Sequence, residues 1–170
     1  MRTIANSVLR IVQFFLVLIA TALIGNVRAT SQHAASSATS AINFAIFVLA
    51  LSWIAILYGI LIHFIEAIAI PIVALALDSS ATLFTFIGAT VLSAKLTAAN
   101  CANWESGSKP SDWIAFGSDN TEKRCREIQA GLVFMWFLFA TFAATLVLAF
   151  REFRRNGGSV RGPSMSQISA

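Results

Sequence analysis

The chain has 170 residues, of which 57% are hydrophobic and only 12% are charged, and its mean hydropathy is +0.75. Soluble domains carry about 25% charged residues, so this composition excludes an ordinary water-soluble domain and indicates a protein of the lipid bilayer. The net charge of +4 is no sign of nucleic-acid binding, because in a membrane protein the position of the charges matters more than their sum. We therefore expect no nucleic-acid partner.

Four apolar stretches are each long enough to cross a bilayer as a helix, which takes about 20 residues. They cover residues 9–27, 41–62, 68–94 and 128–150, and they predict an all-α membrane protein. Residues 1–150 are expected to form one antiparallel four-helix bundle. The first stretch has an alternative interpretation as a cleaved signal peptide, because Arg2 and Arg10 precede it and Val27-Arg28-Ala29 follows it.

The connection at residues 95–127 is long, of mixed charge, and holds the two cysteines of the chain. Cys101 and Cys125 lie near the two helix ends that an antiparallel bundle brings together, so we predict a disulfide; two unpaired thiols are the alternative. Disulfides persist in oxidising compartments, which places this loop outside the cell and both termini in the cytosol. The numbers of Lys and Arg residues on the two sides are equal and do not decide the orientation.

Asp78 interrupts the third stretch. A charged group at the bilayer centre costs about 2.5–3.5 kcal/mol or more, so its side chain should face protein or water. Arg10 and Gln13 enter the first stretch from the same side, and about ten residues, roughly 15 Å of helix, separate Asp78 from the predicted helix start. We expect these three side chains to meet and to fix the register of the helices. A paired packing role for Asp78, an Arg10 that extends to the headgroups, and an ion path are the alternatives.

Small residues recur at every fourth position of the third stretch, on the face that also carries Asp78, and in two sets on the fourth. This spacing is typical of transmembrane helices that pack closely. The residues predicted to pack are Ala81, Thr85, Ala89, Ser93, Ala140, Thr141, Ala144 and Thr145.

Residues 151–170 form a basic tail, which its composition predicts to be disordered. A basic residue near an anionic leaflet contributes about 1 kcal/mol of attraction, and ordinary flanking charge is the alternative. The predicted acidic-lipid contacts are Arg151, Arg154, Arg155 and Arg161.

Motifs for catalysis are absent from the sequence: it has no phosphate-binding loop, nucleophile elbow or zincin helix. His63 and Glu66 are too few for a zinc site, which takes three or four protein ligands. We therefore predict no enzyme activity, no cofactor and no metal. Trp104 and Trp113 are expected either at the headgroup layer or in a small core of the long loop.

Several passages resemble the fungal non-classical export protein 2 family, whose members have a MARVEL domain. They are LYGILIHFIE (57–66), PIVALALDSSATLFTFIGATVLSA (71–94), Cys101 and KRCREIQAG (123–131), and NSVLRIVQFF (6–15) is similar to the start of a MARVEL domain. Ala67 stands where the family is expected to have proline. The resemblance implies a four-helix MARVEL fold in furrow-like, eisosome-associated microdomains of the plasma membrane. It also implies a response to sphingolipids and a link to unconventional secretion.

The expected function is a non-enzymatic organiser of plasma-membrane lipid microdomains. Its expected partners are membrane lipids (sphingolipid, sterol or anionic lipid), further copies of the chain, and eisosome or other plasma-membrane proteins. A small transporter or channel subunit, or an accessory subunit of a larger complex, is the alternative. A water-filled path along Asp78 would favour transport, whereas a dry, packed bundle would favour organisation.

Overall fold

The computed structural model describes residues 2–32, 34–65, 70–97, 100–102, 109–110 and 112–155. Within these residues the chain forms four α-helices: α1 (Arg2–Ala29), α2 (Ser36–Phe64), α3 (Pro71–Leu96) and α4 (Thr121–Arg155). All four are long and apolar enough to cross a membrane. The prediction of an all-α membrane protein with four spans is confirmed.

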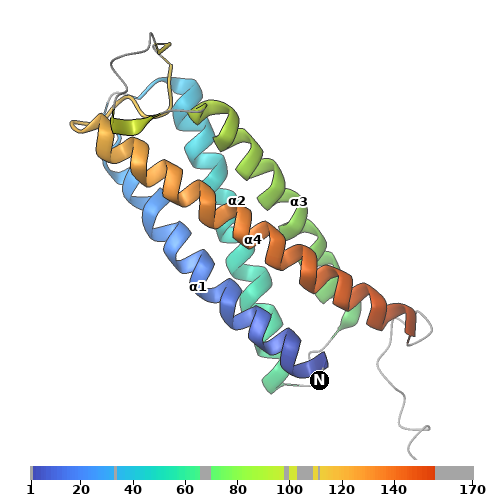
Figure 1. Ribbon diagram of the computed structural model, residues 1–170. Helices are drawn as coiled ribbons and strands as arrows, with labels where there is room; N and C mark the ends of the chain where they lie inside the picture. The colour runs from blue at the N-terminus through green and yellow to red at the C-terminus, as the bar shows by residue number, and fades with distance from the viewer. Residues whose placement is uncertain are drawn as a thin grey trace, which may run out of the picture.

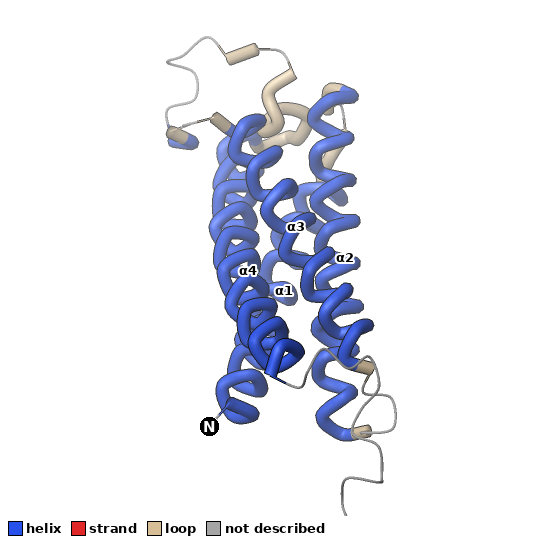
Figure 2. The backbone as a smooth tube through the Cα atoms, turned by 90° about the vertical axis from the view of Figure 1, so that its right-hand side faces the viewer, coloured by secondary structure: helices blue, strands red, loops and turns tan. Residues whose placement is uncertain are grey.

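The helices form a four-sided antiparallel bundle (Figures 1 and 2). α1 packs against α2 and α4, and α3 packs against the same two helices. α1 and α3 therefore lie diagonally across the bundle, without close approach of their described backbones. The start of α1 and the end of α4 lie at the same end, here called the terminus end. The described residues between α3 and α4 lie at the opposite end, the loop end (Figure 1).

The ends of all four helices differ from the predicted ones, and α2 covers Ser36–Phe64 rather than residues 41–62. α4 begins at Thr121 rather than at residue 128, because the charged residues of its first turns form helical pairs instead of a loop: Arg126 with Glu122, and Lys123 with Glu127. α4 also continues to Arg155, so the first five residues of the predicted tail are helical. α1 begins at Arg2 rather than at residue 9. α3 begins at Pro71 rather than at residue 68, with proline at the first helical position, where its missing N–H is not needed.

The core is filled by apolar side chains, and the predicted stripe on α3 lies within it. Ala81, Thr85 and Ala89 are buried, and Ser93 is half-buried. Glycine allows a close approach at Gly88, where a Cβ atom would lie 2.8 Å from Met135 Cε of α4. α3 and α4 therefore pack closely through small residues, as such stripes predict.

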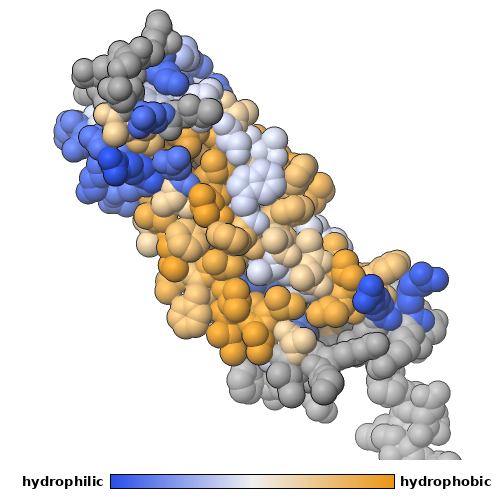
Figure 3. Space-filling model, viewed as in Figure 1, coloured by the Kyte–Doolittle hydropathy of each residue, from blue (hydrophilic) through white to orange (hydrophobic). Residues whose placement is uncertain are grey.

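The second set on α4 does not pack within the bundle. Ala140 and Ala144 are exposed on its outer surface, whereas Thr145 is buried and Thr141 half-buried. The sequence predicted close packing for both sets without saying which set faces the bundle, because it does not fix the rotation of a helix with small residues on two faces. Large apolar side chains are exposed on all four helices, and Figure 3 shows this hydrophobic surface between two hydrophilic ends.

Candidate functional site

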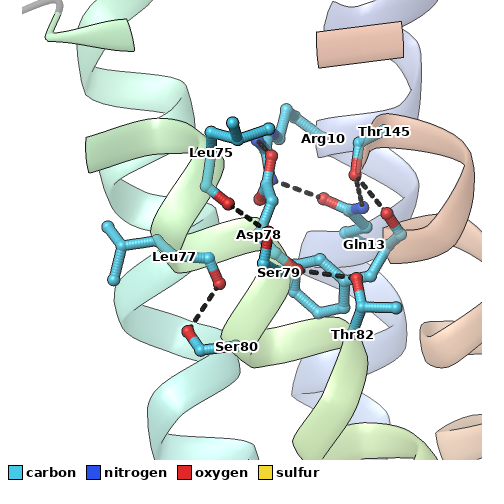
Figure 4. A network of polar contacts seen from close by, with 10 residues as sticks. Arg10, Gln13, Leu75, Leu77, Asp78, Ser79, Ser80, Thr82 and Thr145 are labelled. Atoms are coloured by element: carbon cyan, nitrogen blue, oxygen red, sulfur yellow. Dashed lines mark hydrogen bonds and ion pairs between the residues drawn. The ribbon is translucent and has the colours of Figure 1, made fainter. Parts of the chain in front are cut away.

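Four polar side chains from three helices meet inside the bundle and are here called the polar cluster: Arg10, Gln13, Asp78 and Thr145 (Figure 4). Arg10 and Gln13 share one face of α1, because residues three apart in a helix are neighbours on its surface. Asp78 comes from α3 and Thr145 from α4. None of the four is more than 4% exposed.

The centre of the polar cluster is a two-point ion pair across the bundle diagonal. Arg10 Nη1 donates to Asp78 Oδ1 at 2.9 Å, and Nη2 donates to Oδ2 at 2.6 Å. Such fork-shaped pairs are the strongest hydrogen-bonded contacts between side chains. Arg10 Nη1 also donates to Gln13 Oε1 at 3.1 Å, and Gln13 Nε2 donates to Thr145 Oγ1 at 3.3 Å. The structure thus brings together the three residues singled out in the sequence and adds Thr145 as a partner.

The polar cluster lies nearer the terminus end than the sequence suggested. Because α3 begins at Pro71, Asp78 is about two turns, roughly 10 Å, from the helix start rather than roughly 15 Å. The hydrocarbon core of a bilayer is about 30 Å thick. The ion pair therefore lies inside the apolar layer but off its centre.

α2 contacts the polar cluster at Gly59, which has no side chain and so leaves room for Arg10. A Cβ atom on Gly59 would overlap Arg10 Nε and would lie 2.6 Å from Arg10 Cζ. The guanidinium therefore lies directly against the α2 backbone, and all four helices meet at this level. Gly59 could not be recognised from the sequence, because one glycine in an apolar helix gives no sign of the face on which it lies.

We expect Gly59→Ala to destabilise the protein by about 1–3 kcal/mol, since the added methyl group must displace a paired and buried arginine. The measurement is the free energy of unfolding in detergent micelles. Gly25→Ala is the matched control: no atom lies within 4 Å of its Cβ position, so it should stabilise α1 by about 0.5–1 kcal/mol through helix propensity. Equal effects of the two substitutions would contradict the close approach of Arg10 to α2.

Apart from Arg10 Nε, the polar groups described for the cluster bond to one another or to the backbone. Both carboxylate oxygens of Asp78 accept from Arg10, and the Thr145 hydroxyl donates to Phe142 O at 2.9 Å. Arg10 Nε is buried without a partner, on the side that faces Gly59. Within the described residues, no group of three or more His, Cys, Asp or Glu side chains could hold a metal ion.

A disulfide joins Cys101 to Cys125, with 5.6 Å between their Cα atoms. The prediction of a bridge across the long loop is confirmed, and the alternative of two unpaired thiols is wrong. The bridge attaches the chain just after α3 to the first turns of α4 at the loop end.

Arg124, next to this disulfide, is a buried cation that the sequence analysis did not single out. It is 2% exposed. Its Nε donates to Ile114 O at 3.1 Å, and its Nη1 donates to Val27 O at 2.9 Å and to Ser31 Oγ at 2.6 Å. Its contacts therefore connect the end of α1, the long loop and the start of α4.

Trp113 belongs to the core of the loop rather than to the headgroup layer. It is 2% exposed, and its Nε1 donates to Leu96 O at 2.9 Å, which satisfies a carbonyl at the end of α3. Nearby, a hydrogen bond from Ser37 and then contacts from Lys95 lower the pKa of Asp112. Trp104 lies outside the described residues.

The predicted lipid contacts at the terminus end are described only in part. Arg151 and Arg154 are exposed on the last turns of α4, where Figure 3 shows a hydrophilic surface. Arg161, the Arg155 side chain, the His63 side chain and Glu66 lie outside the described residues.

The chain is similar to known membrane proteins over nearly its whole length. Residues 3–148 match the MARVEL family, a membrane-associating domain. Non-classical export protein 2 of Saccharomyces cerevisiae is 34% identical over 182 residues, which cover 99% of this chain and 100% of that protein. Non-classical export protein 2 homolog 1 of the same yeast is 28% identical over 160 residues, covering 93% of this chain and 86% of that protein. No solved structure matches the chain significantly.

Proposed function

Because this chain belongs to the MARVEL family of membrane-associating domains and to the non-classical export protein 2 family, we propose that it is a non-enzymatic organiser of plasma-membrane lipid microdomains. The microdomains are of the eisosome type, both termini lie in the cytosol, and the loop end lies outside. The name of its yeast relatives further suggests a part in export by a non-classical route.

The observation that carries this proposal is the closed pairing of Asp78. A carboxylate that relays protons or ions through a membrane protein faces a water-filled path. Asp78 is instead 2% exposed and gives both oxygens to Arg10. This arrangement favours a dry, packed bundle over a transporter or channel. A bundle whose polar groups are paired internally would act through its outer surface.

The outer surface offers three kinds of contact to an organiser. Large apolar side chains on all four helices meet lipid tails, whether of phospholipid, sphingolipid or sterol. Ala140 and Ala144 present small residues outward on α4, which suits close packing against a second copy of the chain. Arg151 and Arg154 lie where an anionic leaflet would attract them, and eisosome or other membrane proteins are further partners in this proposal.

The test is expression of a fluorescent fusion in Saccharomyces cerevisiae cells that lack Non-classical export protein 2. We expect the chain to collect in stable surface patches and to restore secretion of a reporter without a signal peptide. Arg154→Gln should weaken enrichment in patches about fivefold, from the loss of about 1 kcal/mol of attraction to anionic lipid. Lys109→Gln removes the same charge at the loop end and should change nothing. An even surface distribution of the unaltered chain would refute the proposal.

A further inference from the structure

The large exposed apolar side chains stop short of the loop end on every helix. The last of them towards that end are Ile19 on α1, Ile46 on α2, Ile87 on α3 and Val133 on α4. Beyond this level the exposed residues are small or polar. They include Thr21, Ala22, Asn26, Ser40, Asn43, Thr90, Ala94, Arg126 and Gln129. These residues form a band, here called the collar, between the hydrophobic surface and the loop end.

Within this collar, an open groove of about 600 Å³ lies where α1 faces the first turns of α4. Its apolar part is formed by Leu23 of α1 and Ala130 of α4. Its charged part is formed by Glu122, Lys123, Arg126 and Glu127 of α4. Figure 3 shows the hydrophilic surface at this end directly above the hydrophobic one. The groove has room for a headgroup and the upper part of one acyl chain, and its apolar and charged parts follow the order of these groups in a phospholipid.

The charges of the groove are balanced. Arg126 pairs with Glu122 at 2.6 Å, and Lys123 pairs with Glu127 at 3.8 Å. The two cationic side chains are 61% and 66% exposed, and exposed pairs of this kind contribute little free energy. Glu127 is held more firmly, because its side chain is 16% exposed and its Oε1 also accepts from Asn26 Nδ2 at 2.8 Å. The pair of Arg126 with Glu122 is therefore the easier of the two to exchange for a ligand. Two cations beside two carboxylates match a headgroup that itself carries one charge of each sign.

We propose that this groove binds one phospholipid of the outer leaflet through a zwitterionic headgroup. The phosphodiester lies against Lys123 and Arg126, the ammonium group lies against Glu122 and Glu127, and the upper acyl chain covers Leu23 and Ala130. An anionic headgroup would be attracted by the two cations but repelled by the two carboxylates. A sterol hydroxyl carries no charge and would pair with none of the four charged side chains. This inference rests on the proposed membrane role, including its orientation, and names a lipid class for it.

The test uses the full-length protein in nanodiscs of equal parts phosphatidylcholine and phosphatidylglycerol, released for native mass spectrometry. We expect retained phosphatidylcholine to exceed phosphatidylglycerol. The double variant Lys123→Gln/Arg126→Gln should retain about thirtyfold less phosphatidylcholine. The control Lys95→Gln/Lys109→Gln removes two positive charges from the loop end outside the groove, and it should retain phosphatidylcholine normally. Ala130→Phe keeps every charge but fills the apolar part, and it should lower retention as well.

Each outcome bears on the proposal directly. Equal retention of the two lipids, preference for phosphatidylglycerol, or normal retention by both groove variants would overturn it. Thermal unfolding of each variant distinguishes loss of the groove from loss of the fold. If this test fails while the chain still forms normal patches in cells, only the proposed lipid site is refuted. If the unaltered chain forms no patches, the proposed function itself is refuted.

Discussion

Asp78→Leu is expected to destabilise the protein by about 3–5 kcal/mol, the largest effect of any single substitution considered. The change removes the partner of Arg10 and leaves a cation that is 4% exposed inside the apolar layer. Removing one member of a buried pair costs this much because the other charge remains without compensation. The measurement is equilibrium unfolding in mixed micelles with increasing dodecyl sulfate. Ser79→Ala is the control, since the Ser79 hydroxyl is exposed and donates only to Leu75 O of its own helix.

The double variant Arg10→Met/Asp78→Leu should recover most of the lost stability. Replacing both members of a buried ion pair by apolar groups of similar volume is often neutral or stabilising. A double-mutant cycle with Arg10→Met alone then gives the coupling free energy of the pair. Additive effects of the two single substitutions would show that the pair has no structural importance, and so would an unchanged Asp78→Leu protein.

Loss of the disulfide, in Cys101→Ser/Cys125→Ser, is expected to cost about 3 kcal/mol. The bridge closes a loop whose ends are 24 residues apart in the sequence, and removing it increases the conformational entropy of the unfolded chain. Unfolding in the same micelles should show the same loss for the unaltered protein treated with a reductant. Adding reductant to the double serine variant should have no further effect.

Thiol labelling provides an independent check on the bridge and its side of the membrane. Without reductant, intact cells should show no labelling of the unaltered protein. The single variant Cys101→Ser frees Cys125, but Cys125 is fully buried, so Cys125→Ser with its freed Cys101 is the better reporter. After mild denaturation of the loop, an impermeant maleimide should label that Cys101 from outside. Labelling only after the cells are opened would reverse the proposed orientation.

The spans of the fold could be predicted because each is a continuous apolar run, and lipid accepts few other structures. The helix ends could not. Glu122, Lys123 and Arg126 look like a polar loop in the sequence, but i,i+4 pairing keeps them helical outside the hydrocarbon layer. The composition of the chain shows where the apolar residues end, but a helix can continue past that point.

A residue of the candidate site could be predicted where placing it in the apolar layer costs free energy. Where this cost is small, the sequence carries no sign of the residue's role. Asp78 in an apolar run is expected to face protein or water, and Arg10 was a cation within reach, so the pair could be predicted beside the alternative of an Arg10 that extends to the headgroups. Gly59 and Thr145 can stand in a membrane helix at little cost in free energy, so neither needs a partner. Only the rotation of α2 and α4 about their axes brings them against Arg10 and Gln13. Arg124 reads as an ordinary loop charge until tertiary contacts with Ile114 and Val27 bury it.

The diagonal position of the Arg10–Asp78 pair has a mechanical consequence. Four parallel rods that touch only along the sides of a square can slide into a rhombus without breaking any side contact. α1 packs on α2 and α4 but not on α3. The contacts between neighbouring helices therefore do not by themselves prevent this change from a square to a rhombus near the terminus end. The ion pair holds the two opposite corners at a fixed distance. Near the terminus end, the Arg10–Asp78 pair thus helps to fix the cross-sectional shape that the protein presents to neighbouring lipids.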